Sequence, residues 1–478
     1  MNTMATTQAG MRSHIQSNDI HVIKVGGENA SDARTAEWLA NFYNSGNHTS
    51  VAISALRANW LNTTDELIKA RTAFDVSGMW WAMPILENLF EVHLETLRNA
   101  NMYDSELGDK LRILFEHTFP NELLLQPDLI RESRESILER RFIWYGEVMS
   151  AHVLAHLLDT RYRVATRLLT EQLPGNWRTL SDALRRETAA IITENIKNNL
   201  VVVPWYVSVR DAELLTAYGR GYTDKTAERI AVWLSDRWWN PILHIQKQLP
   251  LLSSDPRKIP WARPVSALSY YSAGEITWAR WANARVLNEN TITRDLMSNN
   301  IPVWVYNPFE QDGAKSIIST SGSSESGILF VDGRDHVSTI TLSGFGMEGP
   351  GLLSGMTQFF TRYWIWIDSI SSSETEVTFT TYNKLTESQN SELRRELGRA
   401  FPQHEVRIEN NLGMIYCIGD NLSGHPGLLS QIGSILANEG IDIECISQSR
   451  WQRGILIGIH SDNLKRWVAA LHKALIEG

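Results

Sequence analysis

The chain has 478 residues and a formal net charge of −9 at pH 7, which argues against a nucleic-acid partner. Its length exceeds what one hydrophobic core usually holds, so we expect two or three domains. The two cysteines, Cys417 and Cys445, provide neither a disulfide framework nor metal-ligand spacing, which fits a cytoplasmic protein. No apolar run reaches membrane-spanning length, so no membrane partner is expected.

The first predicted strand ends in a glycine turn. Residues 1–19 are polar and expected to be flexible, and the β-rich run His21–Val25 follows them. Gly26 and Gly27 come next, before a helix that Ser31-Asp32 should open. A lysine at a strand end, beside glycines and a helix start, has the geometry of a phosphate cradle, although neither the Walker nor the GxGxxG pattern matches. The alternative is that Lys24 is an exposed strand-end lysine.

A second buried-type strand is predicted at Val51–Ala55, and residues 66–200 are predicted to be mainly helical. Pro84 is expected to open a helix at Ile85–Leu97, because proline is favoured in the first helical turn. A later helix contains Tyr145-Gly146-Glu147. Glycine inside a helix costs about 1 kcal/mol relative to alanine and often marks the close approach of a backbone or a ligand. Glu147 beside it is either a site residue or a solvated surface side chain.

The stretch Gly219–Ala227 places a glycine-flanked arginine, two hydroxyl groups and an aspartate before a helix. A helix N-terminus offers free N–H groups, and Arg220 offers a fork suited to a carboxylate or a phosphate. The alternative is an ordinary helix start in which Thr223 or Asp224 is the N-cap.

Strands at Leu200–Val203, Ile242–Ile245 and Ile301–Val305 alternate with helices, which predicts an open, mostly parallel sheet. Such sheets bind ligands at the carboxyl ends of their strands. Between the last two strands, Asp255-Pro256 forms a turn from which Arg257 emerges.

The C-terminal part contains an internal repeat. Each copy has the order βαββαβ, with a Pro-Gly turn at the same place (Pro350-Gly351 and Pro426-Gly427). We therefore predict a catalytic-type α/β domain over 20–315, a Ser/Gly-rich linker over 316–327 and two ferredoxin-like domains over 328–409 and 410–478. The first strand of the earlier ferredoxin-like domain can pair with the later one.

Taken together, these residues resemble the aspartate kinase (aspartokinase) family, with its amino acid kinase fold and two C-terminal ACT domains. The resemblance covers nearly the whole chain and rests on six short motifs in the family's order. These are Lys24-Val25-Gly26-Gly27, Ser54-Ala55 with Thr64, Tyr145-Gly146-Glu147, Gly219-Arg220-Gly221-Tyr222-Thr223-Asp224, Asp255-Pro256-Arg257 and Asn283-Ala284-Arg285-Val286-Leu287. The Arg-Gly-Tyr turn is more similar to the divergent branch of the family that accompanies ectoine biosynthesis than to the housekeeping enzymes.

The resemblance implies that ATP, with Mg²⁺, phosphorylates the β-carboxylate of L-aspartate by positioning and charge neutralisation, in the first step of aspartate-derived amino-acid or ectoine-type biosynthesis. On this resemblance Lys24, Gly26 and Gly27 would hold the transferring phosphate. Asp224 would orient the part of the site that binds the substrate. Glu147 would bind the α-ammonium and Arg220 the α-carboxylate, with Ser54 and Thr223 beside them. Lys24, Gly27, Lys247, Arg257 and Arg285 would contact ATP, and no residue is assigned as a metal ligand.

The sequence also departs from the family pattern. Glu28-Asn29 replace the Thr-Ser that follows the double glycine, and a dry carboxylate there would be unfavourable beside anionic reactants. Tyr222 replaces a glycine. Two alternatives therefore stay open: a catalytically weak regulatory or binding subunit, or a kinase for another amino-acid carboxylate.

The resemblance further implies a homodimer formed through the ACT domains and an amino-acid effector bound there. The candidate effector residues are Gly424, Pro426, Gly427 and Gln448. The family's Ser-Ser-Glu after Ile-Ser-Gln is absent, so feedback by lysine or threonine could be lost. In that case the ACT units would only form the dimer interface.

Overall fold

The computed structural model divides the chain into two compact units, residues 1–250 with 287–320 and residues 251–286 with 321–478. Each unit is described separately below. The residues that the structure describes are 18–53, 55, 63–119, 134–169, 190–204, 222–278, 294–310, 313–324, 327–345, 351–382, 384–448, 453–462 and 464–477.

The first unit is built on a mostly parallel sheet with the strand order β3-β4-β2-β1-β5-β7-β8. Neighbouring strands are parallel up to β7, and β8 is antiparallel to β7. The open, mostly parallel sheet predicted from the alternating pattern is therefore confirmed. The strands are β1 (Asp19–Val25), β2 (His48–Ile53), β3 (Thr166–Leu168), β4 (Leu200–Pro204), β5 (Asn240–Gln246), β7 (Val303–Tyr306) and β8 (Lys315–Ser319).

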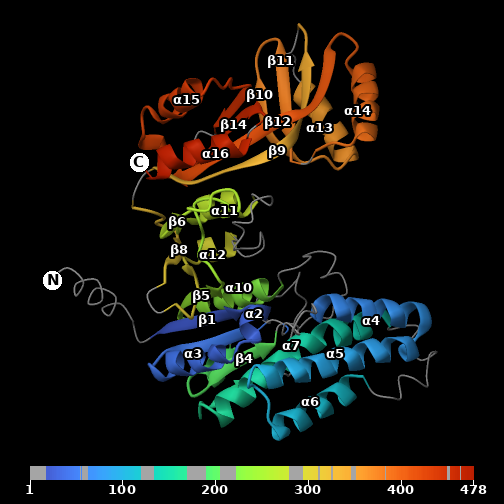
Figure 1. Ribbon diagram of the computed structural model, residues 1–478, viewed down its shortest axis with the longest axis vertical. Coiled ribbons are helices and arrows are strands. Elements are labelled where there is room, and N and C mark those ends of the chain that lie inside the picture. Colours follow the sequence, from blue (N-terminus) through green and yellow to red (C-terminus); the bar gives the residue numbers. More distant parts are fainter. Residues whose placement is uncertain are drawn as a thin grey trace, which may run out of the picture. The chain divides into compact units, whose positions relative to one another are not determined.

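Side chains of β1 alternate between the two faces of this sheet, and both faces are covered. Ile23 belongs to the core formed with α3 and the helices that follow it, whereas Lys24 contacts α10 on the opposite face. Figure 1 shows α3 and α10 on opposite sides of β1. The helices are α2 (Gly27–Ala30), α3 (Ala33–Asn44), α4 (Thr63–Ser77), α5 (Met79–Asn99), α6 (Ser105–Thr118), α7 (Arg134–Thr160), α10 (Tyr222–Ser235) and α12 (Arg294–Ser298).

Two helix starts test the sequence interpretation. Asp32 caps α3 and accepts a hydrogen bond from the backbone N–H of Arg34 at 2.9 Å, as Ser31-Asp32 predicted. The prediction that Pro84 opens its helix is wrong, because α5 begins at Met79 and contains Pro84. Met79 and Ala82 are buried in the core, and this packing keeps the first turn helical although proline removes one backbone hydrogen bond.

No helix in the described part of the chain is both long and apolar enough to cross a membrane.

The second unit contains a sheet with the strand order β10-β11-β9-β12-β14-β13. Its two long central strands, β9 and β12, pair antiparallel along most of their lengths. The N-terminal half of β9 lies beside the part of β12 that continues to β14, and its C-terminal half lies beside β11. The strands of this sheet are β9 (Gly327–Ser343), β10 (Ile367–Ser372), β11 (Glu376–Thr381), β12 (Glu405–Asp420), β13 (Cys445–Gln448) and β14 (Gly454–His460). The short strand β6 (Ala267–Ser269) belongs to this unit but not to this sheet.

Two separate cores pack against this sheet, one for each half of the repeat. Ile340 and Phe379 belong to one core, and Ile415 and Ile457 belong to the other. The helices of this unit are α11 (Tyr270–Trp278), α13 (Leu352–Arg362), α14 (Glu387–Ala400), η2 (Leu422–Gly424), α15 (Leu428–Asn438), α16 (Leu464–His472) and the π-helical turn η3 (Lys473–Glu477).

The division into units differs from the domain boundaries expected from the sequence. Residues 316–319 of the expected linker belong to β8 (Lys315–Ser319) in the first sheet. Residues 251–286, expected within the catalytic-type domain, belong to the second unit. The physical reason is that side chains of this segment, among them Lys258 and Ser272, form hydrogen bonds with β9 and β12.

Candidate active site

Lys24, at the carboxyl end of β1, forms a buried ion pair with Asp224. Only 6% of Lys24 is exposed, and its Nζ lies 2.8 Å from Oδ1 of Asp224. Asp224 is fully buried in the first turn of α10, which begins at Tyr222. Lys24 is therefore not an exposed strand-end lysine. Neither Thr223 nor Asp224 is the N-cap of α10, because both lie inside the helix.

The strand order places Lys24 where ligands of open α/β sheets usually bind. From β1 the chain continues to β2 on one side, and after β4 it returns to β5 on the other side of β1. A reversal of this kind leaves a crevice at the carboxyl ends of the strands. Gly26 and Gly27 follow β1 at this edge.

The glycine turn leaves space beside the Lys24 ammonium. A Cβ atom added at Gly26 would lie 3.4 Å from Nζ of Lys24, so a side chain there would fill the space next to the charge. A buried cation beside a glycine backbone fits a phosphate group, as the resemblance implies.

Glu28 and Asn29 occupy the positions at which the sequence departs from the family. Glu28 is exposed, so the cost expected for a dry carboxylate does not apply in the structure. Asn29 is buried, and its Nδ2 has no hydrogen-bond partner among the described residues. We therefore expect the amide of Asn29, more than the carboxylate of Glu28, to affect a ligand in this turn.

Glu147 lies on α7, where Gly146 allows close contact with the chain that follows β2. A Cβ atom at position 146 would lie 2.8 Å from Cβ of Ala55 and 3.0 Å from Cγ2 of Thr63. The helical glycine thus marks the close approach of side chains from another segment, where the sequence pattern suggested a backbone or a ligand. This approach brings Glu147 to the end of β2, the strand next to β1.

Glu147 is buried and not solvated. Its Oε2 has no hydrogen-bond partner among the described residues. Burial raises the pKa of Glu147 to about 8, although hydrogen bonds from the backbone amides of Glu147 and Ala55 act in the opposite direction. A buried carboxylate with an open oxygen is suited to an ammonium group.

Replacing Gly146 with alanine is expected to lower the melting temperature. The overpacking against Ala55 should cost about 1–3 kcal/mol, which exceeds the roughly 1 kcal/mol gained in helix propensity. Gly398→Ala is the matched control, because that helical glycine has no atom within 4 Å of an added Cβ and should become slightly more stable. Calorimetry measures both shifts, and a Gly146→Ala protein as stable as Gly398→Ala would contradict the close approach.

Only some of the predicted site residues lie near one another in the structure. Thr223 is buried next to Asp224, and Lys247 follows β5 at the same sheet edge as Lys24. Arg257 belongs to the second unit, so its assignment stays a prediction. Ser54, Arg220 and Arg285 lie outside the described residues.

The candidate effector residues occupy two places in the second unit. Gly424, Pro426 and Gly427 lie in the turn between β12 and α15, where Gly427 is the N-cap with φ of 90°, a conformation that favours glycine. Gln448 ends β13 and is opposite Ile455 of β14. Their role as an effector site stays a prediction.

Sequence reasoning did not assign two buried amides near this edge, Asn29 and Gln246. Gln246 ends β5 next to Tyr306, and it is 1% exposed. A buried position at a strand end was readable from the pattern, but nothing in the pattern separates a functional amide from a structural one.

The described residues contain no cluster of three or more His, Cys, Asp or Glu side chains that could hold a metal ion. Mg²⁺ often binds through one or two carboxylates together with substrate phosphates. A nucleotide-bound Mg²⁺ therefore needs no dedicated protein cluster here.

Comparisons with known proteins agree with this geometry. An ACT domain model matches residues 415–475. The bifunctional aspartokinase/homoserine dehydrogenase of Haemophilus influenzae is 26% identical over 312 residues, which cover 63% of this chain and 37% of that protein. The aspartokinase of Schizosaccharomyces pombe is 24% identical over 368 residues, 70% of this chain and 68% of that protein. The chain thus spans less than half the length of the bifunctional relative.

The fold is also similar to that of a solved aspartokinase. The structure of E. coli aspartokinase III in complex with lysine and aspartate superimposes with a TM-score of 0.68, covering 96% of this chain and 99% of that chain at 20% identity. The expected amino acid kinase-like sheet with a C-terminal ACT domain is therefore confirmed. The chain is a distant homologue of the aspartokinases, with their fold and with an ACT domain in its C-terminal part.

Proposed function

We propose that this protein transfers the γ-phosphoryl group of ATP to the β-carboxylate of L-aspartate. The observation that carries the proposal is the buried Lys24–Asp224 pair beside the Gly26-Gly27 turn at the switch point of the sheet. Two residues 200 positions apart, selected from short motifs, lie within 2.8 Å of each other. This is the arrangement expected if the motifs form one site.

Each described residue has a role that follows from its charge. Lys24 neutralises charge on the transferring phosphoryl group, and Asp224 holds the ammonium in place. Glu147 binds the α-ammonium of the substrate through its open oxygen. The acceptor carboxylate is already ionised at pH 7, so the reaction needs no catalytic base. Arg257 and Lys247 contact the nucleotide on this proposal, with Mg²⁺ bound to its phosphates.

Aspartate is the proposed acceptor because Glu147 supplies a partner for an amino group, and because E. coli aspartokinase III was solved with aspartate bound. The exposure of Glu28 removes the main objection to activity. An amino-acid effector at the ACT domain and a homodimer are part of the same proposal.

Trapping of acyl phosphate by hydroxylamine tests the proposal. Purified protein with Mg·ATP would be offered aspartate, glutamate or N-acetylaspartate, and hydroxamate formation would be followed by its colour with iron(III). We expect hydroxamate with aspartate alone. Product with a different acid would indicate another carboxylate kinase. No product, with ATP binding still measurable by calorimetry, would favour a regulatory or binding subunit.

A further inference from the structure

The glycine turn after β1 is a single helical turn next to the Lys24 ammonium. The N–H of Ala30 donates to the carbonyl of Gly26 at 2.8 Å, which closes the turn. Gly26 is its N-cap, and no side chain caps it. Because a Cβ atom at Gly26 would lie 3.4 Å from Nζ of Lys24, the space on the Gly26 side of the turn adjoins the buried charge.

Asn29 presents a buried amide in this turn. It stands three residues after the N-cap, at the position whose side chain folds back toward the cap in a capping box. Its side chain therefore lies on the Gly26 side of the turn, near the space next to Lys24. Asn29 is 4% exposed, and its Nδ2 has no hydrogen-bond partner among the described residues. A buried donor usually has a partner, and the neighbouring ammonium favours an anionic ligand oxygen in that role.

The backbone of Asn29 is fixed by α3. Its carbonyl accepts a hydrogen bond from Oγ1 of Thr35 at 2.6 Å and another from the N–H of Asp32 at 3.1 Å. The Thr35 hydroxyl differs from those of Thr96 and Thr118, which bond to the carbonyl four residues earlier in their own helices. It bonds to a carbonyl six residues earlier, outside α3, and so joins this helix to the turn.

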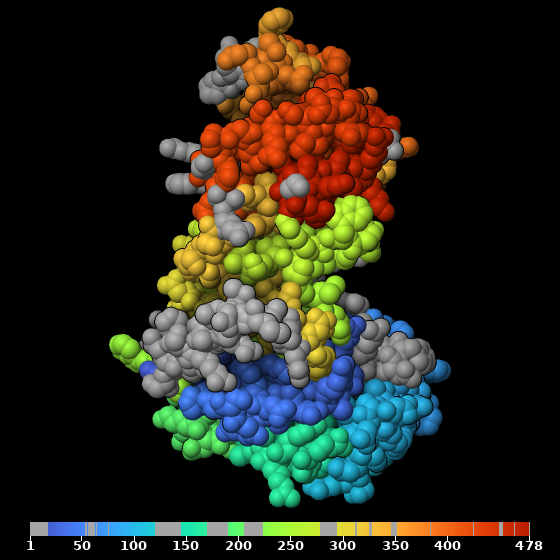
Figure 2. Space-filling model, turned by 60° about the vertical axis from the view of Figure 1, so that its left-hand side comes forward, coloured from blue at the N-terminus to red at the C-terminus, as the bar shows by residue number. Residues whose placement is uncertain are grey.

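Thr35 is itself held in place because it lies on the inner face of α3. It is 2% exposed, and its neighbours Ala36 and Leu39 belong to the core that α3 shares with β1. Exposed residues such as Arg34 and Glu37 place the outer face of α3 at the surface of the first unit, in the blue part of Figure 2. The hydroxyl therefore connects the turn to the core.

We propose that Thr35 is a positioning residue for phosphoryl transfer, which holds the Asn29 carbonyl so that Nδ2 of Asn29 donates to an oxygen of the transferring phosphoryl group. The inference rests on the proposed function, in which Lys24 neutralises charge on that group. Lys24 supplies the charge at this site, and the amide adds a donor of fixed direction.

The physical reason is preorganisation. A donor that is already oriented spends no free energy on ordering when the ligand binds. Without the Thr35 hydroxyl, the Asn29 carbonyl keeps only the hydrogen bond from the N–H of Asp32. Helix α2 has four residues, Gly27–Ala30, so its own hydrogen bonds do little to hold the turn. The amide would then spend part of its time turned away from the phosphoryl group.

The test compares Thr35→Val, which keeps the shape of threonine but removes the hydroxyl, with Thr35→Ser, which keeps the hydroxyl. Thr118→Val is the matched control, because Thr118 is also buried and its hydroxyl donates at 2.7 Å to the carbonyl of Leu114 in α6. Calorimetry measures the dissociation constants of a non-hydrolysable Mg·ATP analogue and of Mg·ADP. Because ADP lacks the transferring group, a contact with that group affects the analogue alone.

Asn29→Leu is expected to weaken the analogue about 10- to 100-fold and ADP far less, because it removes a hydrogen bond to a charged group. Thr35→Val should weaken the analogue about three- to tenfold, whereas Thr35→Ser and Thr118→Val should bind it as the unmodified protein does. Adding Thr35→Val to Asn29→Leu should have no further effect, because the hydroxyl acts through the amide. The kcat for hydroxamate formation should fall in the same order, with an unchanged KM for aspartate.

Equal weakening of the analogue and of ADP by Thr35→Val, or a further loss when it is added to Asn29→Leu, would overturn the proposal. A higher KM for aspartate in Thr35→Val would do the same. If Asn29→Leu does not fold, the difference between Thr35→Val and Thr35→Ser decides by itself.

The proposed function and this inference fail in different ways. If no acid yields hydroxamate but the variants weaken the analogue as expected, the proposed function fails and the binding role of the amide stands. If aspartate yields hydroxamate and all variants bind the analogue equally, only the inference fails. An unmodified protein that binds neither nucleotide would overturn both.

Discussion

Replacing Lys24 with methionine is expected to lower kcat for hydroxamate formation by about 100- to 1,000-fold, while the KM for aspartate changes little. The ammonium is buried at the carboxyl end of β1, where it neutralises charge that develops on the transferring phosphoryl group. Methionine keeps the length and the apolar stem of lysine but carries no charge. A contribution of this size corresponds to about 3–4 kcal/mol of transition-state stabilisation.

The same substitution leaves the Asp224 carboxylate buried without its cation, so it should also cost about 3–5 kcal/mol of stability. Combining Lys24→Met with Asp224→Leu should restore much of that stability but none of the activity, which separates catalysis from folding. Lys110→Met serves as the control, because Lys110 pairs with Glu106 at a half-exposed position on α6. An unchanged kcat in a folded Lys24→Met protein would remove Lys24 from the catalytic role.

Replacing Glu147 with glutamine is expected to raise the KM for aspartate by about 30-fold or more. Loss of one partner of a buried charged pair usually costs at least about 2 kcal/mol. Glutamine has the size of glutamate and can still accept the hydrogen bond from the backbone amide of Ala55, so the fold should be retained. The measurement is the hydroxamate assay over a range of aspartate concentrations.

The pH dependence gives a second readout for Glu147. Burial raises its pKa to about 8, so the free protein holds a neutral side chain at pH 6, whereas binding of an ammonium group requires the carboxylate. The KM for aspartate should therefore fall as the pH rises from 6 to 8. Stability should fall as the pH rises, because the unfolded chain loses this proton near pH 4.5 while the folded protein retains it up to about pH 8. Between these values the folded state becomes less stable as the pH rises.

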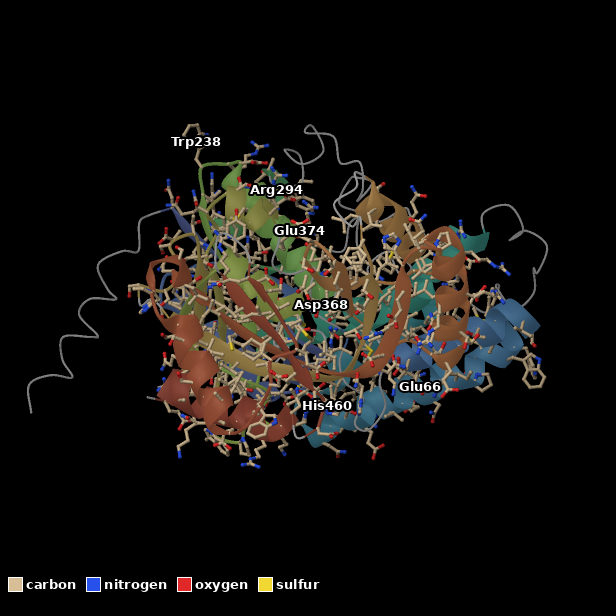
Figure 3. All side chains as sticks on the ribbon, turned by 90° about the horizontal axis from the view of Figure 1, so that it is seen from above. Glu66, Trp238, Arg294, Asp368, Glu374 and His460 are labelled. Carbon is tan, nitrogen blue, oxygen red and sulfur yellow. The ribbon has the colours of Figure 1, made fainter. Side chains whose placement is uncertain are left out.

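Glu147→Gln should flatten both profiles. Glu66→Gln is the control, because Glu66 on α4 pairs with Lys69 at 2.5 Å and is not part of the site (Figure 3). A Glu147→Gln enzyme with an unaltered KM and the same pH profile would show that the buried carboxylate has a structural role only.

The main features of the sheet could be predicted because they depend on local pattern. The run His21–Val25 is rich in β-branched residues and ends at a double glycine, Leu200–Val203 is continuously apolar, and both form strands. The Lys24-to-Gly27 turn and Gly146 could be selected because glycine at such positions has few structural uses. What the pattern could not provide is the pairing of Lys24 with Asp224, which depends on which helix packs on which face.

Whether a charged side chain is buried could likewise not be predicted from the sequence. Glu147 and Glu28 are equally charged and both stand next to a glycine, yet one is buried and the other is exposed. The difference arises from the packing of α7 against the end of β2, a contact between segments about 90 residues apart. The Lys258–Asp332 ion pair was not predicted for the same reason, because the sequence shows only that both residues are charged.

The pairing of the long strands β9 and β12 has a consequence for folding during synthesis of the chain. Phe330 of β9 pairs with Ile418 of β12, so on the ribosome the first partner emerges roughly 90 residues before the second. During that interval an apolar strand edge is open to other chains. A truncated protein that starts near residue 410 would keep the matched ACT segment yet lose the strand that flanks β12, and we expect it to associate through that edge instead of folding as a monomer.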